Sequence, residues 1–389
     1  MEDTFGILLA CGRSAVGRVA GGAGAAGAGA TDLSAAANRI TDWDAVLDVA
    51  EQHGMLPLVA SELLRSGDGA LPGPVRLQMA AAQREAAARS LAAVRQLAGV
   101  VAVLEQAGVA ALPYKGPMLA LDAFGDVALR AFDDLDIVVQ PSDLGAGAAA
   151  LIGAGYTPRG GREWVTAHSE DRRQGHVTLE RGPDDLPVEL HWRFCDDKLP
   201  WSPDVQGVIA RAGRRMTGGR LLRMLRIPSR EDQVALVLWH AARHGWDQLE
   251  AIVCAAALVA RGVDGPALIA TARAVGGLRA VLTGLDVVHR LFAVPPPRAA
   301  VAAMANDPGI VSLVENAERR LRAGNAGTAR DVRLHMALLD GMPARMLYLT
   351  RTLLVPKPAD LAAIRLPRAL SQLYPLVRVV RLAWRAITR

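Results

Sequence analysis

Hydrophobic residues recur every three to four positions through most of the chain, a spacing typical of amphipathic helices. This pattern predicts helices over residues 42–64 and 75–106, and it resumes beyond position 201. The clearest helix start is Ser229, which is followed three residues later by an acid, as in a capping box. Three consecutive prolines at 295–297 interrupt the helical run. We therefore expect both ends of the chain to be helical.

The pattern changes in the middle of the chain, where short apolar runs alternate with turn residues. Four stretches are typical of strands, and a Pro-Ser-Asp sequence after the second is typical of a helix start. The first is an apolar run that contains Val109 and ends at Pro113, and the second covers 137–139. The third and fourth are HVTLE over 176–180 and PVELHW over 187–192. Strands mixed with helices in this way predict a small α+β domain.

The whole chain is accordingly expected to have an α+β fold with three regions. Residues 1–106 form an N-terminal helical region with a glycine- and alanine-rich loop at 21–30. Residues 107–200 form the α+β core. Residues 201–389 form a C-terminal helical domain that ends in a basic helix.

Charge is distributed unevenly along the 389 residues. The formal net charge is +5, but residues 344–389 hold nine Lys and Arg residues against the single acid Asp360. A basic surface over the whole molecule is therefore not expected, and nucleic acid is an improbable partner. Arg378, Arg381 and Arg385 fall on one face of the terminal helix, which predicts a docked helix with a solvated basic stripe or, alternatively, a contact with an acidic partner or anionic lipid.

Cysteine usage and hydropathy suggest the compartment. The three cysteines have no paired spacing, so neither a disulfide framework nor a zinc knuckle is predicted. The N-terminus has Glu2 and Asp3 where a signal peptide would be basic, and no uncharged apolar run approaches the ~18 residues of a spanning helix. We expect a soluble, cytoplasmic protein.

Three carboxylates precede a predicted buried strand in the sequence FDDLDIVV. Residues two apart on a strand share a face, so Asp134 and Asp136 should project together while Asp133 points away. Glu189, on a later strand, would supply a third carboxylate if the two strands were neighbours. Such a set suits a two-metal phosphoryl-transfer site, because Mg²⁺ binds carboxylate and phosphate oxygens. A solvated turn is the alternative for the aspartates, and an exposed edge-strand acid for Glu189.

Two further features favour phosphate binding. Lys115 and Gly116 lie at a predicted strand-to-helix junction, where glycine lets the backbone approach a phosphate and the helix N-terminus favours negative charge. Arg130, four residues before Asp134, could add guanidinium donors to a triphosphate. An ion pair of Arg130 with Asp133 or Asp134 is the structural alternative.

Taken together, these residues resemble the uncharacterised nucleotidyltransferase family of the DNA polymerase β superfamily. The resemblance extends over roughly residues 109–258 and includes the helix with His240 and His244. Its matching positions are Lys115, Gly116, Arg130, Asp134, Asp136, Glu189, His191 and Trp192.

The resemblance implies a minimal nucleotidyltransferase fold flanked by helices, two Mg²⁺ ions, and transfer of a nucleoside monophosphate from a triphosphate, with ATP as the expected donor. It implies that Asp134, Asp136 and Glu189 are the metal-binding and catalytic acids. Lys115, Gly116 and Arg130 would hold the donor phosphates. A ribosomally made, lasso-type peptide is the expected acceptor by resemblance, with a small molecule, a tRNA end or a protein side chain as alternatives.

The chain departs from the superfamily at three positions. It has Gly116-Pro117 where a Gly-Ser or Gly-Gly pair is usual, and proline lacks a backbone N–H for phosphate. The third acid is Glu189 where many members have Asp. Cys254 stands where family members tend to have an acid after the His-x-x-x-His helix. Two rival hypotheses therefore stay open: a catalytically quiet nucleotide- or peptide-binding protein on the same fold, and an enzyme that transfers a phosphoryl group.

The remaining candidates are histidines and an arginine. His191 shares the face of Glu189 by the strand period, so it is either a packing residue behind the site or a second-shell or substrate contact. His240 and His244 lie four residues apart on one helix face, with Arg243 beside them. With no third ligand evident, a core or substrate-facing pair is expected there, and a metal site is the alternative.

Overall fold

The fold is described from a computed structural model of the chain. The structure describes residues 2–21, 32–66, 71–160, 175–195, 199, 201–214, 225–324, 332–356, 360, 363–364 and 366–387. The glycine-rich loop predicted at 21–30 lies outside these residues except for Gly21.

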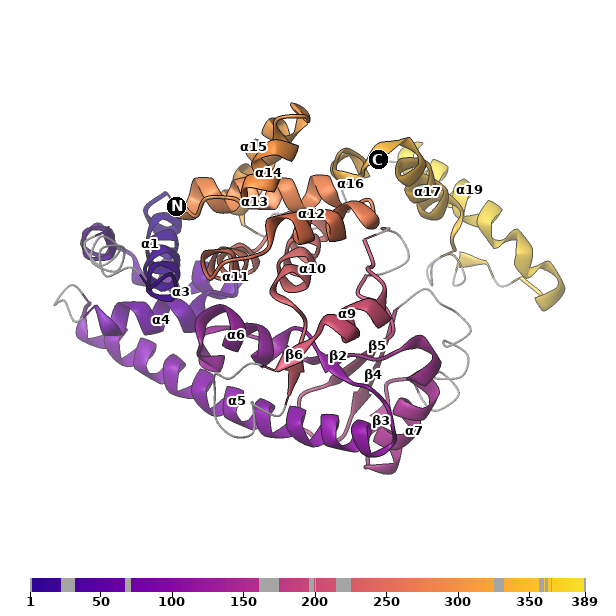
Figure 1. The fold of residues 1–389 in the computed structure, drawn as a ribbon, viewed down its shortest axis with the longest axis horizontal. Helices are drawn as coiled ribbons and strands as arrows, with labels where there is room; N and C mark the ends of the chain where they lie inside the picture. Colours follow the sequence, from indigo (N-terminus) through magenta and orange to yellow (C-terminus); the bar gives the residue numbers. More distant parts are fainter. Residues whose placement is uncertain are drawn as a thin grey trace.

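A small mixed sheet forms one side of the molecule (Figure 1). Its strand order is β1-β2-β5-β4-β3, with β2 and β5 parallel and the other neighbours antiparallel. The strands are β1 (Leu112–Pro113), β2 (Leu135–Val138), β3 (Thr157–Pro158), β4 (His176–Glu180) and β5 (Val188–His191). The strands predicted in the middle of the chain are thus present, within an α+β fold.

Three helices belong to this part of the chain. The long α5 (Gly73–Gln106) runs beneath the sheet in Figure 1, beside α7 (Leu144–Gly153), and α6 (Gly116–Phe124) follows β1. The apolar residues of the central strands pack with the C-terminal half of α5 and with α7 in one core, in which Ile137 and Leu190 are fully buried. The proline start predicted at 141 is present as a 3₁₀ turn, Pro141–Asp143, that leads into α7.

The N-terminal region is helical, as predicted, but one predicted helix is divided. The stretch 42–64 forms α3 (Trp43–Gln52) and α4 (Leu56–Arg65), and α1 (Glu2–Val19) precedes them. The break is at Gly54, whose φ of 66° is in the left-handed region that glycine adopts most easily. The 3.6-residue periodicity continues through the turn, so it could not reveal this break.

The C-terminal region contains most of the helices. They are α9 (Val205–Arg211), α10 (Arg230–Arg243), α11 (Leu249–Ala260), α12 (Gly265–Ala274), α13 (Leu278–Phe292), α14 (Arg298–Met304), α15 (Gly309–Ala323), α16 (Val332–Leu338), α17 (Gly341–Leu354) and α19 (Tyr374–Ile387). The hydroxyl of Ser229 accepts from the backbone N–H of Asp232 at 3.1 Å, which confirms the predicted start of α10. The prolines at 295–297 separate α13 from α14.

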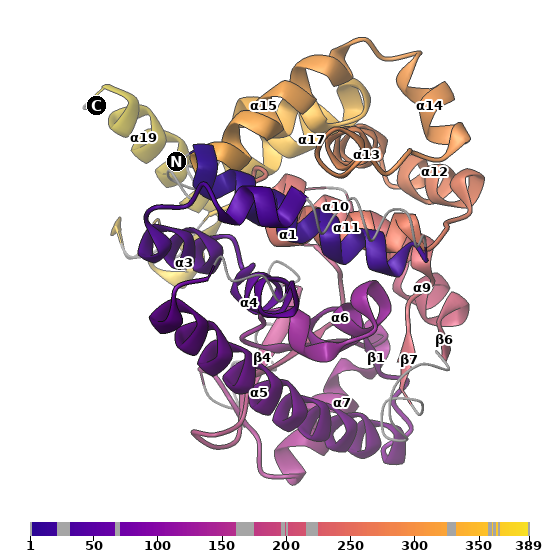
Figure 2. The same ribbon diagram turned by 90° about the vertical axis from the view of Figure 1, so that its left-hand side faces the viewer.

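The two helical regions pack against each other. Figure 2 shows α1 beside α11, and residues of α1, α3 and α4 share one apolar core with those of α10, α11 and α13. Cys11 of α1 and Cys254 of α11 are fully buried in it. The site described below lies between this helical core and the sheet.

A second, two-stranded sheet was not predicted. It consists of β6 (Gly213–Arg214) and β7 (Arg226–Ile227), paired antiparallel. Arg226 also donates to the carbonyl oxygens of Ile209 and Ala212 at 2.7 and 2.8 Å. Strands of two residues have too few positions to show a period, so periodicity could not detect them.

The basic side of α19 is not the solvated stripe that was predicted. Arg378 is 2% exposed and, with Arg381, binds the carboxylate of the buried Asp360. The guanidinium of Arg378 also donates to the carbonyl oxygen of Thr352 in α17. A buried carboxylate requires cationic partners, so the acid turns this face inward. The side chain of Arg385 lies outside the described residues.

Among the described residues, α5 has the length and apolar composition of a membrane-spanning helix. Its apolar positions are used within the protein, because Leu97, Val101 and Leu104 are buried in the core beneath the sheet. Gln96 of the same helix exchanges hydrogen bonds with the backbone of Leu186 at 2.7 and 2.9 Å. Packing within the protein therefore explains the apolar composition of α5.

Candidate active site at the edge of β2 and β5

The predicted acidic cluster forms where two parallel strands lie side by side. Asp136 in β2 is the register partner of Glu189 in β5, and Asp134 directly precedes β2. Asp136 is buried, Asp134 and Glu189 are half-buried, and Asp133 is exposed. The strand period thus turns Asp134 and Asp136 to one side and Asp133 away, as predicted. The structure brings the three predicted carboxylates together.

Lys115 reaches this cluster from the junction of β1 and α6. Its Nζ atom lies 2.9 Å from Asp136 Oδ1. The backbone supports this approach, because the N–H of Tyr114 donates to the carbonyl oxygen of Asp136 at 3.3 Å. Gly116 begins α6 with a φ of 52°. A Cβ atom added at this glycine would lie 3.6 Å from the carbonyl oxygen of Asp134. The predicted strand-to-helix junction therefore places the start of α6 beside the backbone of Asp134, and Lys115 beside the carboxylate of Asp136.

The carboxylates differ in their electrostatic surroundings. Burial, together with the charges of Asp136 and Glu189, raises the pKa of Asp134 to about 7. Burial opposes ionisation of Asp136 as well, but Lys115 and His191 outweigh it and hold the pKa of this carboxyl well below its usual range. Lys115 and His191 thus compensate Asp136. The charge of Asp134 lacks equivalent compensation.

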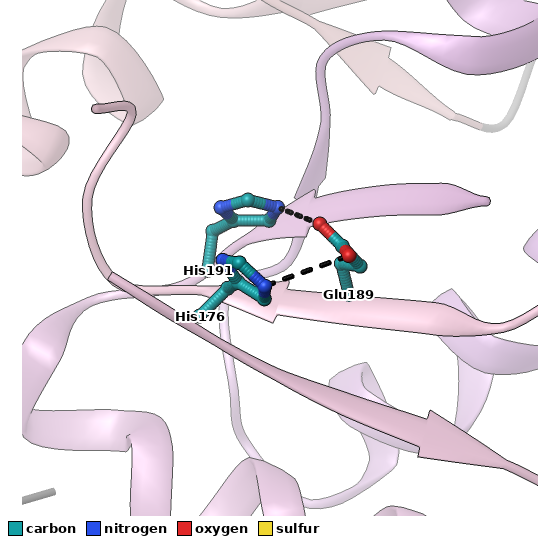
Figure 3. Close-up of side chains that lie close together, drawn as sticks. All are labelled: His176, Glu189 and His191. Carbon is teal, nitrogen blue, oxygen red and sulfur yellow. Dashed lines mark ion pairs between the residues drawn. The ribbon is translucent and has the colours of Figure 1, made fainter. Parts of the chain in front are cut away.

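Two histidines flank the third carboxylate (Figure 3). The Nε2 atom of His191 lies 3.2 Å from Glu189 Oε2 and 3.0 Å from Asp136 Oδ1. The Nε2 atom of His176, in β4, lies 3.5 Å from Glu189 Oε1. Burial opposes protonation of His191, but the two carboxylates outweigh it and raise its pKa, whereas burial and the nearby His191 lower the pKa of His176. His191 is therefore part of the site, and it does more than pack behind it.

The donor set fits a divalent cation. Asp134, Asp136 and Glu189 offer oxygens in a partly buried place, and their mutual repulsion, which raises the pKa of Asp134, would be relieved by a cation. The buried Nε2 atom of His191 has no aligned hydrogen bond although it faces two carboxylate oxygens. These residues would hold the ion, and when bound it would supply Lewis-acid polarisation of a phosphoryl oxygen.

Arg130 has a different neighbour from those weighed in the sequence. Its Nε atom is 2.5 Å from Glu250 Oε1, in α11, and both side chains are 13% exposed. Cys254, one helical turn along α11, donates to the same oxygen at 3.0 Å. Glu250 thus provides an acid one helical turn before Cys254 on the same face of α11. Arg130 links the core to the helical region, and within the described part of the chain it forms its ion pair with Glu250 and none with Asp133 or Asp134.

The histidine pair on α10 lies beside this arginine. His240 lines a small cavity with Lys115, Arg130 and Glu250. The rings of His240 and His244 are 4.6 Å apart between centroids, and Nη2 of Arg243 lies 3.0 Å from His244 Nε2. No group of metal-ligating side chains that includes this pair occurs among the described residues. His240 therefore faces this cavity, whereas His244 is exposed and does not line it, so the two do not form the expected pair.

Sequence reasoning missed two residues of the site. His176 was assigned to a strand, but its place beside His191 depends on the antiparallel register of β4 and β5. Glu250 was not singled out because its partner Arg130 is distant in the chain. The spacing of Glu250 and Cys254 by one helical turn was the available signal for Glu250. For His176 no local signal existed.

Comparison with known proteins gives one match. The family model described as an uncharacterised nucleotidyltransferase matches residues 40–293, which is more than half of the chain. The match includes the strands of the mixed sheet, α10 and α11. Neither the curated proteins nor the solved structures contain a match to the chain.

Proposed function

The chain belongs to the uncharacterised nucleotidyltransferase family, and from this premise we propose that it transfers a nucleoside monophosphate from a triphosphate to an acceptor hydroxyl or terminus. The observation that carries the proposal is the register of β2 and β5, in which Asp136 faces Glu189. This register gathers three carboxylates beside a lysine and a helix N-terminus. The carboxylates suit divalent cations, and the lysine and the helix N-terminus suit phosphates, so a site for a metal-bound triphosphate needs them side by side.

Each residue has a role in the proposed reaction. Asp134 and Asp136 hold divalent cations, Mg²⁺ by family resemblance, and Glu189 holds one of them and assists removal of the acceptor proton. Lys115 binds the donor phosphates, to which the N-terminus of α6 at Gly116 also contributes. The Nζ atom of Lys115 is 2.9 Å from Asp136 Oδ1, and its ammonium group has further N–H donors for a phosphate of the donor.

We further propose that Arg130 acts on the donor from the wall of the cavity beside Lys115. The cavity is lined by polar groups of Lys115, Arg130, Glu250 and His240 together with apolar residues of α10 and α11. The Arg130–Glu250 ion pair fixes the guanidinium at that wall. This arrangement suits the sugar or phosphates of ATP, the expected donor, and leaves the sheet side of the carboxylates for the acceptor.

The sheet with α6 and α7 is proposed to be the family's minimal nucleotidyltransferase fold. In this proposal residues 107–200 are the catalytic core, and the flanking regions 1–106 and 201–389 recognise the acceptor. A peptide, of lasso type by resemblance, is the proposed acceptor, and a small molecule is the alternative.

The proposal is tested by mass spectrometry. The protein is incubated with each ribonucleoside triphosphate and with Mg²⁺, with and without extract of the producing cell, and added mass and pyrophosphate are recorded. We expect a nucleoside monophosphate adduct and pyrophosphate, both absent with the variant Asp136→Asn. The matched control is Asp133→Asn, which changes the exposed neighbouring acid and should behave as wild type.

Two other results would identify the rival functions. Release of a nucleoside diphosphate with a phosphorylated product would identify a phosphoryl transferase. Binding of nucleotide without pyrophosphate release over a broad set of acceptors would identify a catalytically quiet binding protein. Full activity of Asp136→Asn would contradict the proposed site.

A further inference from the structure

The cluster around Glu189 contains two imidazoles that the carboxylate chemistry does not require. His176 and His191 are register partners on β4 and β5, and Glu189 lies two residues before His191 on the same face. Figure 3 shows both rings turned toward the carboxylate. Their Nε2 atoms lie 3.5 and 3.2 Å from its two oxygens. The three ligand atoms lie within 4.8 Å of one another.

The ring nitrogen of His191 is a second feature that favours a cation at this cluster. The side chain is 8% exposed, and Nε2 is shielded from solvent with no aligned hydrogen bond. It nevertheless lies 3.0 Å from Asp136 Oδ1. In the neutral ring with its proton on Nδ1, Nε2 presents a lone pair to two carboxylate oxygens, and none of these three acceptors can satisfy another. A bound cation would satisfy Nε2 by accepting its lone pair.

The spacing also suits a shared ion. Metal–nitrogen and metal–oxygen bonds of about 2.1 Å place two adjacent ligands of an octahedral ion roughly 3 Å apart. The separations of 3.0, 3.2 and 3.5 Å at this cluster are close to that value.

We propose that His176, Glu189 and His191 form a mixed nitrogen–oxygen cation position, adjoining Asp136, that selects Mn²⁺ or a later first-row transition ion over Mg²⁺. The affinity of a nitrogen-containing site for first-row ions rises from Mn²⁺ toward Cu²⁺, whereas Mg²⁺ prefers oxygen ligands alone and retains its waters. The proposal rests on the proposed function in that Glu189 is shared, and it specifies which ion occupies that part of the site.

The test measures the metal itself and needs no nucleotide or acceptor. The full chain is stripped with a chelator and titrated with MnCl₂, and free Mn²⁺ is read from its electron paramagnetic resonance signal. Pulsed measurements on bound Mn²⁺ then report magnetic coupling to ¹⁴N. We expect ¹⁴N coupling typical of histidine in the wild type. We also expect Mn²⁺ affinity to fall about 10- to 100-fold in the double variant His176→Asn/His191→Asn.

The matched control is His289→Asn, which removes an exposed histidine on α13. It should retain both the affinity and the coupling. In competition, Mg²⁺ should displace Mn²⁺ only at an excess of roughly 100-fold or more. Circular dichroism melts establish that the variants are folded, and the wild-type spectrum decides the question even if they are not.

Several outcomes would overturn the inference. These are bound Mn²⁺ without ¹⁴N coupling in the wild type, no binding of Mn²⁺ at millimolar concentration, equal potency of Mg²⁺, or unchanged affinity in a folded double variant. The proposed function fails separately: ¹⁴N-coupled Mn²⁺ without nucleotide transfer would contradict only the reaction, and transfer with an oxygen-only metal site would contradict only the inference.

Discussion

Asp136 and Glu189 face each other across the parallel strands β2 and β5, and the Nε2 atom of His191 lies within 3.2 Å of a carboxylate oxygen of each. The parallel pairing is the one parallel contact in the described sheet. It concentrates negative charge next to Lys115, whose Nζ atom is 2.9 Å from Asp136. The proposed reaction depends on this relationship, and the first prediction follows from it.

Replacing Asp136 by Asn should remove activity but leave the fold intact. The amide keeps the shape of the carboxylate but loses its charge, so cation binding is lost while packing in β2 is retained. We expect the transfer rate to fall by roughly a thousandfold, equivalent to several kcal/mol of transition-state stabilisation. Initial rates and thermal melts measure the two effects, with Asp133→Asn as the control. A fall in melting temperature that accounts for the lost rate would contradict the catalytic role.

Lys115 should affect donor binding more than folding. The variant Lys115→Met keeps the length of the side chain but leaves Asp136 with His191 as its cationic neighbour and removes the phosphate contact. We expect the KM for the triphosphate to rise about 10- to 100-fold. Lys115→Arg should recover only part of this, because a planar guanidinium occupies the space differently. An unchanged KM in Lys115→Met would remove Lys115 from the donor site.

Removing one member of the largely shielded Arg130–Glu250 pair should destabilise the protein strongly. Glu250→Gln leaves a 13% exposed guanidinium without its carboxylate, which is expected to cost about 3 kcal/mol of unfolding free energy. Urea titration measures this cost. The double variant Arg130→Met/Glu250→Leu should be more stable than the sum of its single variants predicts, because it leaves neither charge buried alone.

The same variants separate the two roles of Arg130. If the arginine also contacts the donor, Arg130→Met should raise the KM for the triphosphate more than Glu250→Gln does at equal loss of stability. Equal effects of the two variants on KM would show that Arg130 acts only through its ion pair.

His53 should make stability fall in mild acid. Its ring is buried, Nδ1 accepts from the backbone N–H of Leu249 at 3.2 Å, and burial lowers its pKa from 6.5 to about 4. The unfolded chain therefore binds this proton more readily than the folded one. The stabilisation is present above pH 6.5 and is lost as the pH falls toward 4, up to about 3 kcal/mol.

Urea unfolding between pH 7 and pH 4 measures the effect. The variant His53→Asn retains an acceptor near the position of Nδ1 but does not titrate, so its stability should vary less with pH over this range. His289→Asn, at an exposed position, should keep the wild-type slope. Identical slopes for wild type and His53→Asn would show that other groups cause the acid sensitivity.

Local patterns predicted several parts of the site correctly. The two-residue period of a strand separates Asp134 and Asp136 from Asp133, and the order of Lys115 and Gly116 before a helix indicated the junction at α6. These features depend on neighbours in the sequence, so the sequence carries them directly. The same local reasoning predicted the start of α10 at Ser229, because a helix cap is a contact over three residues.

Contacts between residues that are distant in the sequence could not be predicted from local patterns. His176 reaches Glu189 only through the register of β4 and β5, and a shift of one residue would turn it to the other face. Arg130 pairs with a residue 120 positions away. On α19, helical periodicity identified the shared face of Arg378 and Arg381, but the buried Asp360 decided that this face turns inward, leaving Leu376 and Val380 exposed.

The sequence by itself thus determined which residues carry charge, which faces they share within an element, and the family to which the chain belongs. Only the tertiary structure decided which elements meet, and with them the neighbours of each ionisable group. The physical reason is that helix and strand periods follow from local backbone geometry. Strand register and helix docking instead minimise unpaired buried charge and exposed apolar surface over the whole chain. Strand register places the imidazoles beside Glu189, and helix docking places the carboxylate of Glu250 beside Arg130.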